Sequence, residues 1–119
     1  MSEYFLIFFK GLGISFLRHI ERCRCLLYVI DMSSSDGDEQ LEALAFELEQ
    51  FSPGLSKRPH GIIANKMDLD ESVEHFKNFE RWLKAQKRNL AYLFPISAKE
   101  NINLKPLLHF IKRMSEKDP

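Results

Sequence analysis

Short unbroken apolar runs alternate along this chain with stretches in which apolar residues recur every three or four positions. The unbroken runs are typical of strands buried on both faces, and they occupy residues 25–31, 61–64 and 92–96. A stretch with helical spacing follows each of these runs. The spacing predicts three helices, whose apolar faces fall within residues 41–51, 72–88 and 104–114.

The same spacing predicts which side chains face the core. In the first helix these are Leu41, Leu44, Ala45, Leu48 and Phe51. In the second they are Phe76, Phe79 and Leu83. In the third they are Leu104, Leu107, Leu108, Ile111 and Met114.

Strands that alternate with helices through short loops form right-handed βαβ units, whose strands pair in parallel. The sequence therefore predicts an α/β fold with a three-stranded parallel sheet flanked by helices, in the order 25–31, 61–64, 92–96. Residues 4–9 form a further apolar run, which reads as a short strand available to the edge of the sheet. Residues 11–22 read as a loop that enters another helix.

Two short polar motifs follow the last two of these strands. Asn65-Lys66-Met67-Asp68 comes directly after residues 61–64, and Ser97-Ala98-Lys99 comes directly after residues 92–96. Ligands of open parallel sheets bind outside the carboxyl ends of the strands. Both motifs therefore lie where a ligand is expected.

The chemistry of these residues suits guanine. The Asp68 carboxylate can accept hydrogen bonds from the ring N–H and the exocyclic amine of guanine, a donor pair that adenine lacks. The aliphatic stem of Lys66 can lie against a purine face while its ammonium stays in water. The backbone N–H of Ala98 can reach the guanine carbonyl oxygen, because its small side chain permits close approach.

Two further side chains are suited to holding the loops together. Asn65 can bond the base and also pin the neighbouring loop, and Ser97 can tie its own loop to the first. The alternative is a plain turn, in which Asp68 and Asp70 cap the following helix. Because both motifs follow an apolar strand and one helix separates them, the pair favours guanine recognition over this alternative.

Further segments of the sequence resemble the Obg family of ribosome-associated GTPases. They are Gly11-Leu12-Gly13, Phe16-Leu17-Arg18-His19-Ile20-Glu21-Arg22 and Val29-Ile30-Asp31, followed in order by the two motifs above. Residues 55–60 are most similar to the mitochondrial branch of that family. The resemblance covers residues 10–115. It implies a non-family segment over residues 1–10 and, over residues 11–119, the C-terminal half of an Obg-type GTPase domain, which is a partial P-loop GTPase fold of Rossmann-like type.

The resemblance also implies a function. It implies a guanine-nucleotide-binding fragment of a GTPase involved in assembly of the large ribosomal subunit, with GTP or GDP as ligand and that subunit or its RNA as partner. The guanine-binding residues it implies are Asn65, Lys66, Met67, Asp68, Ser97, Ala98 and Lys99. By resemblance the location is mitochondrial, but the sequence shows no transit peptide. The location expected otherwise is cytoplasmic.

The phosphate-binding elements of that family do not occur in this sequence. It contains no G-x-x-x-x-G-K-[ST] phosphate loop, no matching threonine or D-x-x-G switch and no glycine-rich Obg domain. In the longer parent these elements hold Mg²⁺ and supply the catalysis. We therefore expect weak GTP or GDP binding, no catalytic or metal-binding residues and no hydrolysis. We interpret the chain as a truncated isoform, a partial gene model or a fragment.

Composition adds few constraints. Basic and acidic residues balance to a formal net charge of zero, so contact with nucleic acid would need a local basic patch. The predicted second helix offers one, with a single aromatic residue: Lys77, Arg81, Trp82, Lys84, Lys87 and Arg88. The alternative function is therefore a non-catalytic ribosome- or RNA-binding module that binds no nucleotide.

Metal and membrane functions have no support in the sequence. Cys23 and Cys25 fit neither a redox nor a zinc spacing, and the four histidines show no ligand spacing. No apolar stretch is long enough to cross a bilayer.

Overall fold

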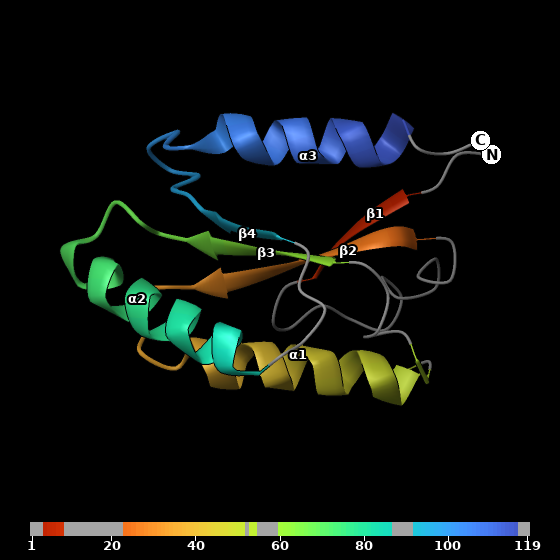
Figure 1. The fold of residues 1–119 in the computed structure, drawn as a ribbon, viewed down its shortest axis with the longest axis horizontal. Coiled ribbons are helices and arrows are strands. Elements are labelled where there is room, and N and C mark those ends of the chain that lie inside the picture. Colours follow the sequence, from red (N-terminus) through yellow and green to blue (C-terminus); the bar gives the residue numbers. More distant parts are fainter. Residues whose placement is uncertain (1–3, 9–22, 52, 55–59, 87–91, 117–119) are drawn as a thin grey trace.

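The computed structural model describes residues 4–8, 23–51, 53–54, 60–86 and 92–116. These residues form a parallel sheet and three helices (Figure 1). In chain order the elements are β1 (Tyr4–Phe8), β2 (Cys23–Asp31), α1 (Gly37–Phe51), β3 (His60–Asn65), α2 (Asp70–Ala85), β4 (Tyr92–Pro95) and α3 (Leu104–Glu116).

The sheet confirms the predicted strand order and direction. Its strands lie in the order β1-β2-β3-β4, and every neighbouring pair is parallel. The apolar run near the N-terminus forms β1, which pairs with β2 from Tyr4 opposite Cys23 to Phe8 opposite Tyr28. The helix predicted within residues 11–22 lies outside the described residues.

The helices cover both faces of the sheet. Helices α1 and α2 lie against one face and α3 lies against the other (Figure 1). Along β2, Leu26, Tyr28 and Ile30 pack toward α1 and α2, whereas Leu27 packs toward α3. This explains why β2 reads as an unbroken apolar run, since a parallel strand between two helical layers is buried on both sides.

Between the sheet and the α1–α2 layer lies the larger part of the core. Leu41, Leu44 and Leu48 of α1 and Phe79 and Leu83 of α2 are buried there, as their spacing predicted. Ala45 of α1 and Phe76 of α2 are partly buried, and the side chain of Phe51 is not among those described.

One glycine permits the close approach of α1 to α2. A Cβ added to Gly37, the first residue of α1, would lie 2.9 Å from Cε of Met32 and 3.0 Å from Cδ1 of Phe79. Those distances are shorter than ordinary van der Waals contact, so a side chain at this position would displace the end of Met32 and the ring of Phe79.

The opposite face corrects one prediction for α3. Leu107 is buried as expected, but Leu108 is 59% exposed, and Phe110 is buried in its place. The ring of Phe110 lies 4.5 Å from that of Tyr92 and 5.2 Å from that of Phe94, measured between centroids. Helix α3 is therefore rotated, relative to the prediction, so that Phe110 faces these two rings of β4. The Phe110 ring buries more apolar surface there than the smaller Leu108 side chain would.

Candidate functional site

The two predicted motifs lie side by side beyond the carboxyl ends of β3 and β4. The N–H of Ile96 donates to the carbonyl of Ala64 at 2.8 Å, and the N–H of Met67 donates to the carbonyl of Ile96 at 2.9 Å. The backbone of the two loops is therefore paired past the last residues of the sheet. Met67 is partly buried against the core below, which anchors the first loop.

Two side-chain hydrogen bonds join the loops. The Ser97 hydroxyl donates to Oδ1 of Asp68 at 2.8 Å, and the backbone N–H of Ala98 donates to Oδ1 of Asn65 at 3.1 Å. Ser97 is fully buried, and its Oγ also accepts a bond from the N–H of Glu100 at 3.1 Å. The loops thus form one cross-linked unit in this structure.

The bond made by Ala98 is one by which Asn65 pins the neighbouring loop, as the sequence analysis expected of that side chain. The same N–H is the donor expected to reach a guanine carbonyl oxygen, and in this structure it is directed at Asn65. The reason is that Asn65 Oδ1 lies within reach of the same donor, and an amide N–H near an acceptor forms a hydrogen bond.

The backbone of Lys66 has an uncommon conformation. Its φ is 72°, in the left-handed region that few residues other than glycine adopt. Its carbonyl accepts bonds from the hydroxyl of Ser72 at 2.7 Å and from the N–H of Leu69 at 3.2 Å, which hold the turn into α2. Its ammonium lies 3.0 Å from Oδ2 of Asp31.

The structure contradicts the reading of the first motif as a plain helix-capping turn. Helix α2 begins at Asp70, and its N-cap residue, Leu69, makes no side-chain capping bond. The carboxylate of Asp68 is bonded to Ser97 of the second loop. Asp68 therefore serves the contact between loops.

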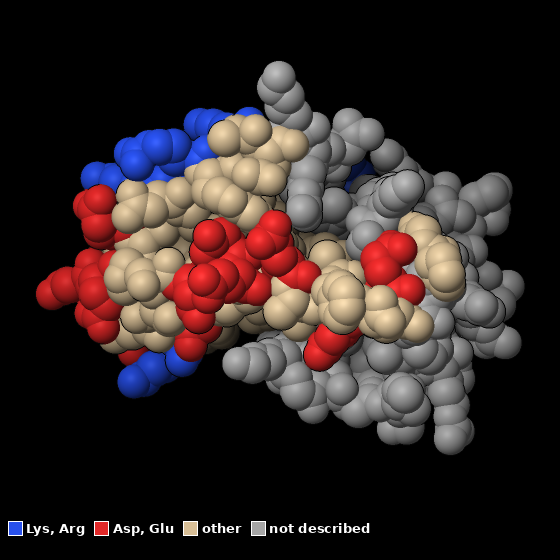
Figure 2. Space-filling model, turned by 90° about the horizontal axis from the view of Figure 1, so that it is seen from below, with Lys and Arg blue, Asp and Glu red and all other residues tan. Residues whose placement is uncertain are grey.

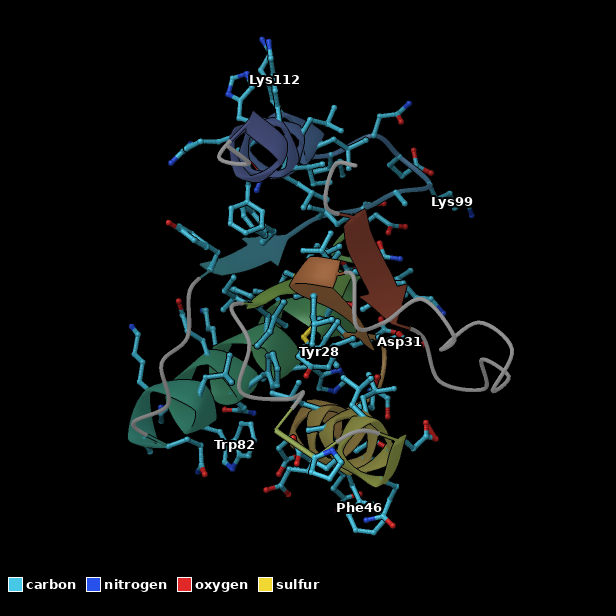
Figure 3. All side chains as sticks on the ribbon, turned by 90° about the vertical axis from the view of Figure 1, so that its right-hand side faces the viewer. Tyr28, Asp31, Phe46, Trp82, Lys99 and Lys112 are labelled. Carbon is cyan, nitrogen blue, oxygen red and sulfur yellow. The ribbon has the colours of Figure 1, made fainter. Side chains whose placement is uncertain are left out.

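Asparagines shape the end of the second loop. Asn101 and Asn103 have φ values of 56° and 59°, the left-handed conformation in which glycine is usual. Between them, Ile102 forms an antiparallel bridge with Ser97, and the Asn103 amide donates to the carbonyl of Pro95 at 2.8 Å. The loop is therefore closed without a glycine. Lys99 is exposed at its tip and points away from the body of the domain (Figure 3).

Sequence reasoning did not single out Asp31 for this site. Asp31 is the last residue of β2 and lies directly opposite Asn65 of β3. The register of β2 with β3 is therefore the information that brings Asp31 beside the first loop. Burial pushes the pKa of its carboxyl upward, but hydrogen bonds from Ser33 and Lys66 outweigh burial and hold that pKa below its ordinary value. Asp31 is therefore a carboxylate beside the first loop.

The basic face proposed for α2 stands near many carboxylates. Lys77, Arg81 and Lys84 are exposed, and Trp82 is stacked on Phe79 with ring centroids 6.0 Å apart. Helix α1, on the same side of the sheet, carries no lysine or arginine, and its carboxylates gather on the surface shown in Figure 2. Lys87 and Arg88 lie outside the described residues.

Other kinds of site are less well supported. Among the described residues no cluster of histidine, cysteine or carboxylate side chains could hold a metal ion. Nor is any helix of the described segments long and apolar enough to cross a membrane. A cavity of about 270 Å³ lies beside α1, and no residue of the two motifs lines it. Its lining residues are Val29, Asp36, Glu39, Gln40, Ala43, Leu44 and Glu47.

Comparison of the sequence with known proteins identifies GTPases. No protein-family model matches the sequence. GTPase Obg of Streptococcus suis is 42% identical over 115 residues, which are 92% of this chain and 26% of that protein. Human mitochondrial ribosome-associated GTPase 2 is 42% identical over 103 residues, which are 87% of this chain and 24% of that protein.

Solved structures of the GTPase Era share the fold. Era in complex with MgGDPNP and a segment of 16S ribosomal RNA superposes with a TM-score of 0.62 at 20% identity, covering 87% of this chain and 32% of Era. Aquifex aeolicus Era bound to GDP and aluminium fluoride gives a TM-score of 0.56 at 18% identity, over 84% of this chain and 32% of that one. The fold is thus of the P-loop GTPase type, as predicted.

The chain spans about a quarter of the length of the relatives it matches. Over nearly all of its own length it is a homologue of the Obg GTPases and of mitochondrial ribosome-associated GTPase 2, as the sequence motifs indicated.

Proposed function

We propose that this chain is a guanine-nucleotide-binding part of an Obg-type GTPase, in which residues 65–68 and 97–99 recognise the base. The observation that carries the proposal is the orientation of Asp68 by Ser97. One carboxylate oxygen accepts the Ser97 hydroxyl at 2.8 Å. A carboxylate has about four acceptor positions, so capacity remains for the two donors on the edge of guanine.

The other residues of the loops have complementary roles in this proposal. The stem of Lys66 lies on the purine face, and the Ala98 N–H turns from Asn65 to the guanine carbonyl oxygen when the base arrives. That exchange frees Asn65 to bond the base in turn. Because one hydrogen bond replaces another, the exchange has a small net cost. Met67 supports the first loop from the core, and Lys99 is an exposed cation at the tip of the second.

Phosphate binding is a separate matter. The sequence contains no phosphate loop, and in longer proteins of this type that loop and Mg²⁺ supply most of the nucleotide affinity. We therefore propose weak binding of GTP or GDP and no hydrolysis by this chain. The name of one relative supports association with a ribosome and mitochondria as the compartment. We propose assembly of the large ribosomal subunit as the process.

The test is a titration of the 119-residue chain with GDP, ADP and XDP, followed by NMR. We expect GDP to bind more tightly than ADP. Asp68→Asn replaces an acceptor with a donor, so it should weaken GDP and favour XDP, whose exocyclic group is an oxygen. Asp70→Asn, two residues further on and exposed, is the matched control and should leave all three affinities unchanged. Equal affinity of the parent chain for GDP and ADP would refute the proposal.

A second candidate function is contact with ribosomal RNA, and the charge distribution favours α3 over α2 as its surface. Lys105, Lys112 and Arg113 are exposed, and no carboxylate occurs between residues 104 and 113. Figure 3 shows Lys112 pointing away from the sheet. The lysines of α2 instead share their helix with Asp70, Glu71, Glu74 and Glu80. A polyanion is therefore attracted more strongly to α3.

Anisotropy of a labelled RNA hairpin at several salt concentrations distinguishes the two helices. Charge reversal at Lys105 and Lys112 should weaken binding and reduce its salt dependence, whereas reversal at Lys77 and Lys84 should change neither much. If only the α2 variant loses binding, α3 is not the RNA surface. A chain that binds the hairpin but no guanine nucleotide would favour the RNA-binding module as the main function.

A further inference from the structure

Asp31 links three segments of the protein at the end of β2. Its Oδ2 lies 3.0 Å from the ammonium of Lys66, in the first loop. Its Oδ1 accepts the backbone N–H of Ser33 at 2.8 Å and the Ser33 hydroxyl at 2.6 Å. Both carboxylate oxygens are thus occupied, so the side chain is held in one orientation.

Helix α1 holds the backbone of the same residue. The side-chain amide of Gln40 accepts the N–H of Asp31 through Oε1 and donates to its carbonyl through Nε2, both at 2.9 Å. The Gln40 amide nitrogen also donates to Oδ1 of Asp36 at 2.9 Å. This bidentate contact fixes the position of Asp31 relative to α1 before any ligand arrives.

Lys66 is held at both of its ends. Its carbonyl is bonded to Ser72 and Leu69, and its ammonium is bonded to Asp31. The four-carbon stem lies between these two fixed points. A lysine side chain without such a partner samples many rotamers, and ordering it on binding would oppose association.

We propose that Asp31 is a positioning residue of the guanine site, which holds Lys66 so that its stem is ready to lie on the purine face. This inference rests on the proposed function, because it assigns Asp31 a role only through Lys66. Asp31 itself does not touch the base. In this arrangement Gln40 of α1 fixes the position of the Asp31 backbone, and the Asp31 carboxylate fixes the position of the Lys66 side chain in the first loop.

The expected loss of GDP affinity on removing the Asp31 charge is small, because both side chains of the ion pair are partly exposed. The side chains of Lys66 and Asp31 are 50% and 41% exposed, so water and salt screen their attraction. We expect Asp31→Asn to weaken GDP binding about threefold to fivefold at low salt. The difference from the parent chain should decline as salt is raised to about 1 M. Asparagine keeps an oxygen for Ser33, so the turn after β2 should survive.

The first test needs no nucleotide. The ammonium of Lys66 is followed by ¹⁵N NMR as the pH is lowered in the free chain. In the parent chain its signal should respond to titration of Asp31, and in Asp31→Asn that response should disappear. Asp38→Asn, which removes a carboxylate from the first turn of α1, is the matched control and should retain it. A Lys66 signal that is identical in the parent chain and in Asp31→Asn would overturn the inference.

The second test is a double-mutant cycle on affinity for GDP and IDP, which lacks the exocyclic amine. Asp31→Asn should weaken both nucleotides by the same factor, since the stem contacts any purine. It should have no further effect in a Lys66→Met background. An equal loss in both backgrounds would mean that Asp31 acts without Lys66, and the inference would be wrong.

These outcomes separate the inference from the proposed function. If the free chain shows the Lys66 response but binds GDP no better than ADP, the guanine proposal is wrong. The positioning role is then wrong as well, because there is no guanine site for Lys66 to serve. If GDP is preferred but Lys66 is indifferent to Asp31, only the positioning role is wrong. Asp31→Glu, which keeps the charge, should restore part of the affinity lost in Asp31→Asn.

Discussion

The hydroxyl of Ser97 donates a 2.8 Å hydrogen bond to Oδ1 of Asp68, a residue 29 positions earlier in the sequence. Because the same oxygen accepts the N–H of Glu100, the hydroxyl is used as donor and acceptor at once. The hydroxyl thus connects Asp68 of the first loop with the backbone of the second. The orientation of the Asp68 carboxylate is therefore set by the loop after β4.

Ser97→Ala should loosen Asp68 while leaving the fold in place. Loss of one side-chain hydrogen bond to a charged partner costs about 1.5 kcal/mol, so GDP affinity should fall about tenfold. The measurement is an NMR titration with GDP. Ser34→Ala, an exposed serine in the loop before α1, serves as control and should bind GDP like the parent chain. Unchanged affinity in Ser97→Ala would show that Asp68 does not depend on the second loop.

Phe110 should stabilise the domain far more than its neighbour Leu108. Phe110 is buried against Tyr92 and Phe94, so Phe110→Ala should lower the free energy of unfolding by about 3 kcal/mol. Leu108→Ala, on the exposed side of the same helix, should change it by no more than about 0.5 kcal/mol. Urea unfolding followed by circular dichroism gives both values. Equal losses for the two variants would contradict the observed rotation of α3.

Deletion of residues 1–9 should lower solubility. Strand β1 pairs along β2, and its removal would leave the N–H and C=O groups of that β2 edge open to pairing with other chains. The soluble fraction after expression and the elution volume on a sizing column measure the effect. Deletion of residues 117–119 is the control. A deleted chain that stays monomeric and soluble would show that β1 is dispensable as an edge cover.

Much of this fold could be predicted from the sequence, because a strand that is buried on both faces appears there as an unbroken apolar run. Strand order and direction followed from chain alternation, and the two loops followed from their position after β3 and β4. The exposed position of Leu108 was not predictable in this way. On a helix, residues 107, 108, 110 and 111 fall within a broad arc, and the rings of β4 decide which part of the arc is buried.

Contacts between loops were less accessible to sequence reasoning. Nothing local marks Asp31 as a partner of Lys66, because the two residues meet only through the register of β2 with β3. Likewise the sequence analysis expected a guanine carbonyl oxygen as the acceptor for the N–H of Ala98, and expected Asn65 to pin the neighbouring loop without naming the donor. The structure shows the bond to Asn65.

Acidification should weaken the contribution of Asp31 to stability. Its pKa is depressed in the folded chain, so its stabilisation is fully present above the ordinary value of 3.8 and is lost as the pH falls through the lower folded value. The parent chain should therefore exceed Asp31→Asn in stability by at most about 1 kcal/mol near pH 7, given its exposure. That advantage should vanish as the pH is lowered below about 4. Urea unfolding at a series of pH values measures it, and an advantage that persists at the lowest pH would exclude an origin in the carboxylate.

The isolated chain should show no GTPase activity. Hydrolysis requires backbone amides and a lysine around the β- and γ-phosphates, a ligand for Mg²⁺ and a positioned water. We expect none of these from the two loops, in which Ser97, Asn65 and Lys66 are directed at Asp68, Ala98 and Asp31. Base contacts alone should give an affinity near 1 mM, or about 4 kcal/mol of binding free energy.

Phosphate release from GTP by the purified chain should therefore equal that of buffer, with and without Mg²⁺. Asp68→Ala provides the matched variant, since it removes base recognition and nothing else that hydrolysis needs. Activity found equally in both proteins would identify a contaminating GTPase. Turnover that is present in the parent chain and lost in Asp68→Ala would show that these loops hold the nucleotide productively, and that the phosphates find their cradle in a part of the chain other than the two loops.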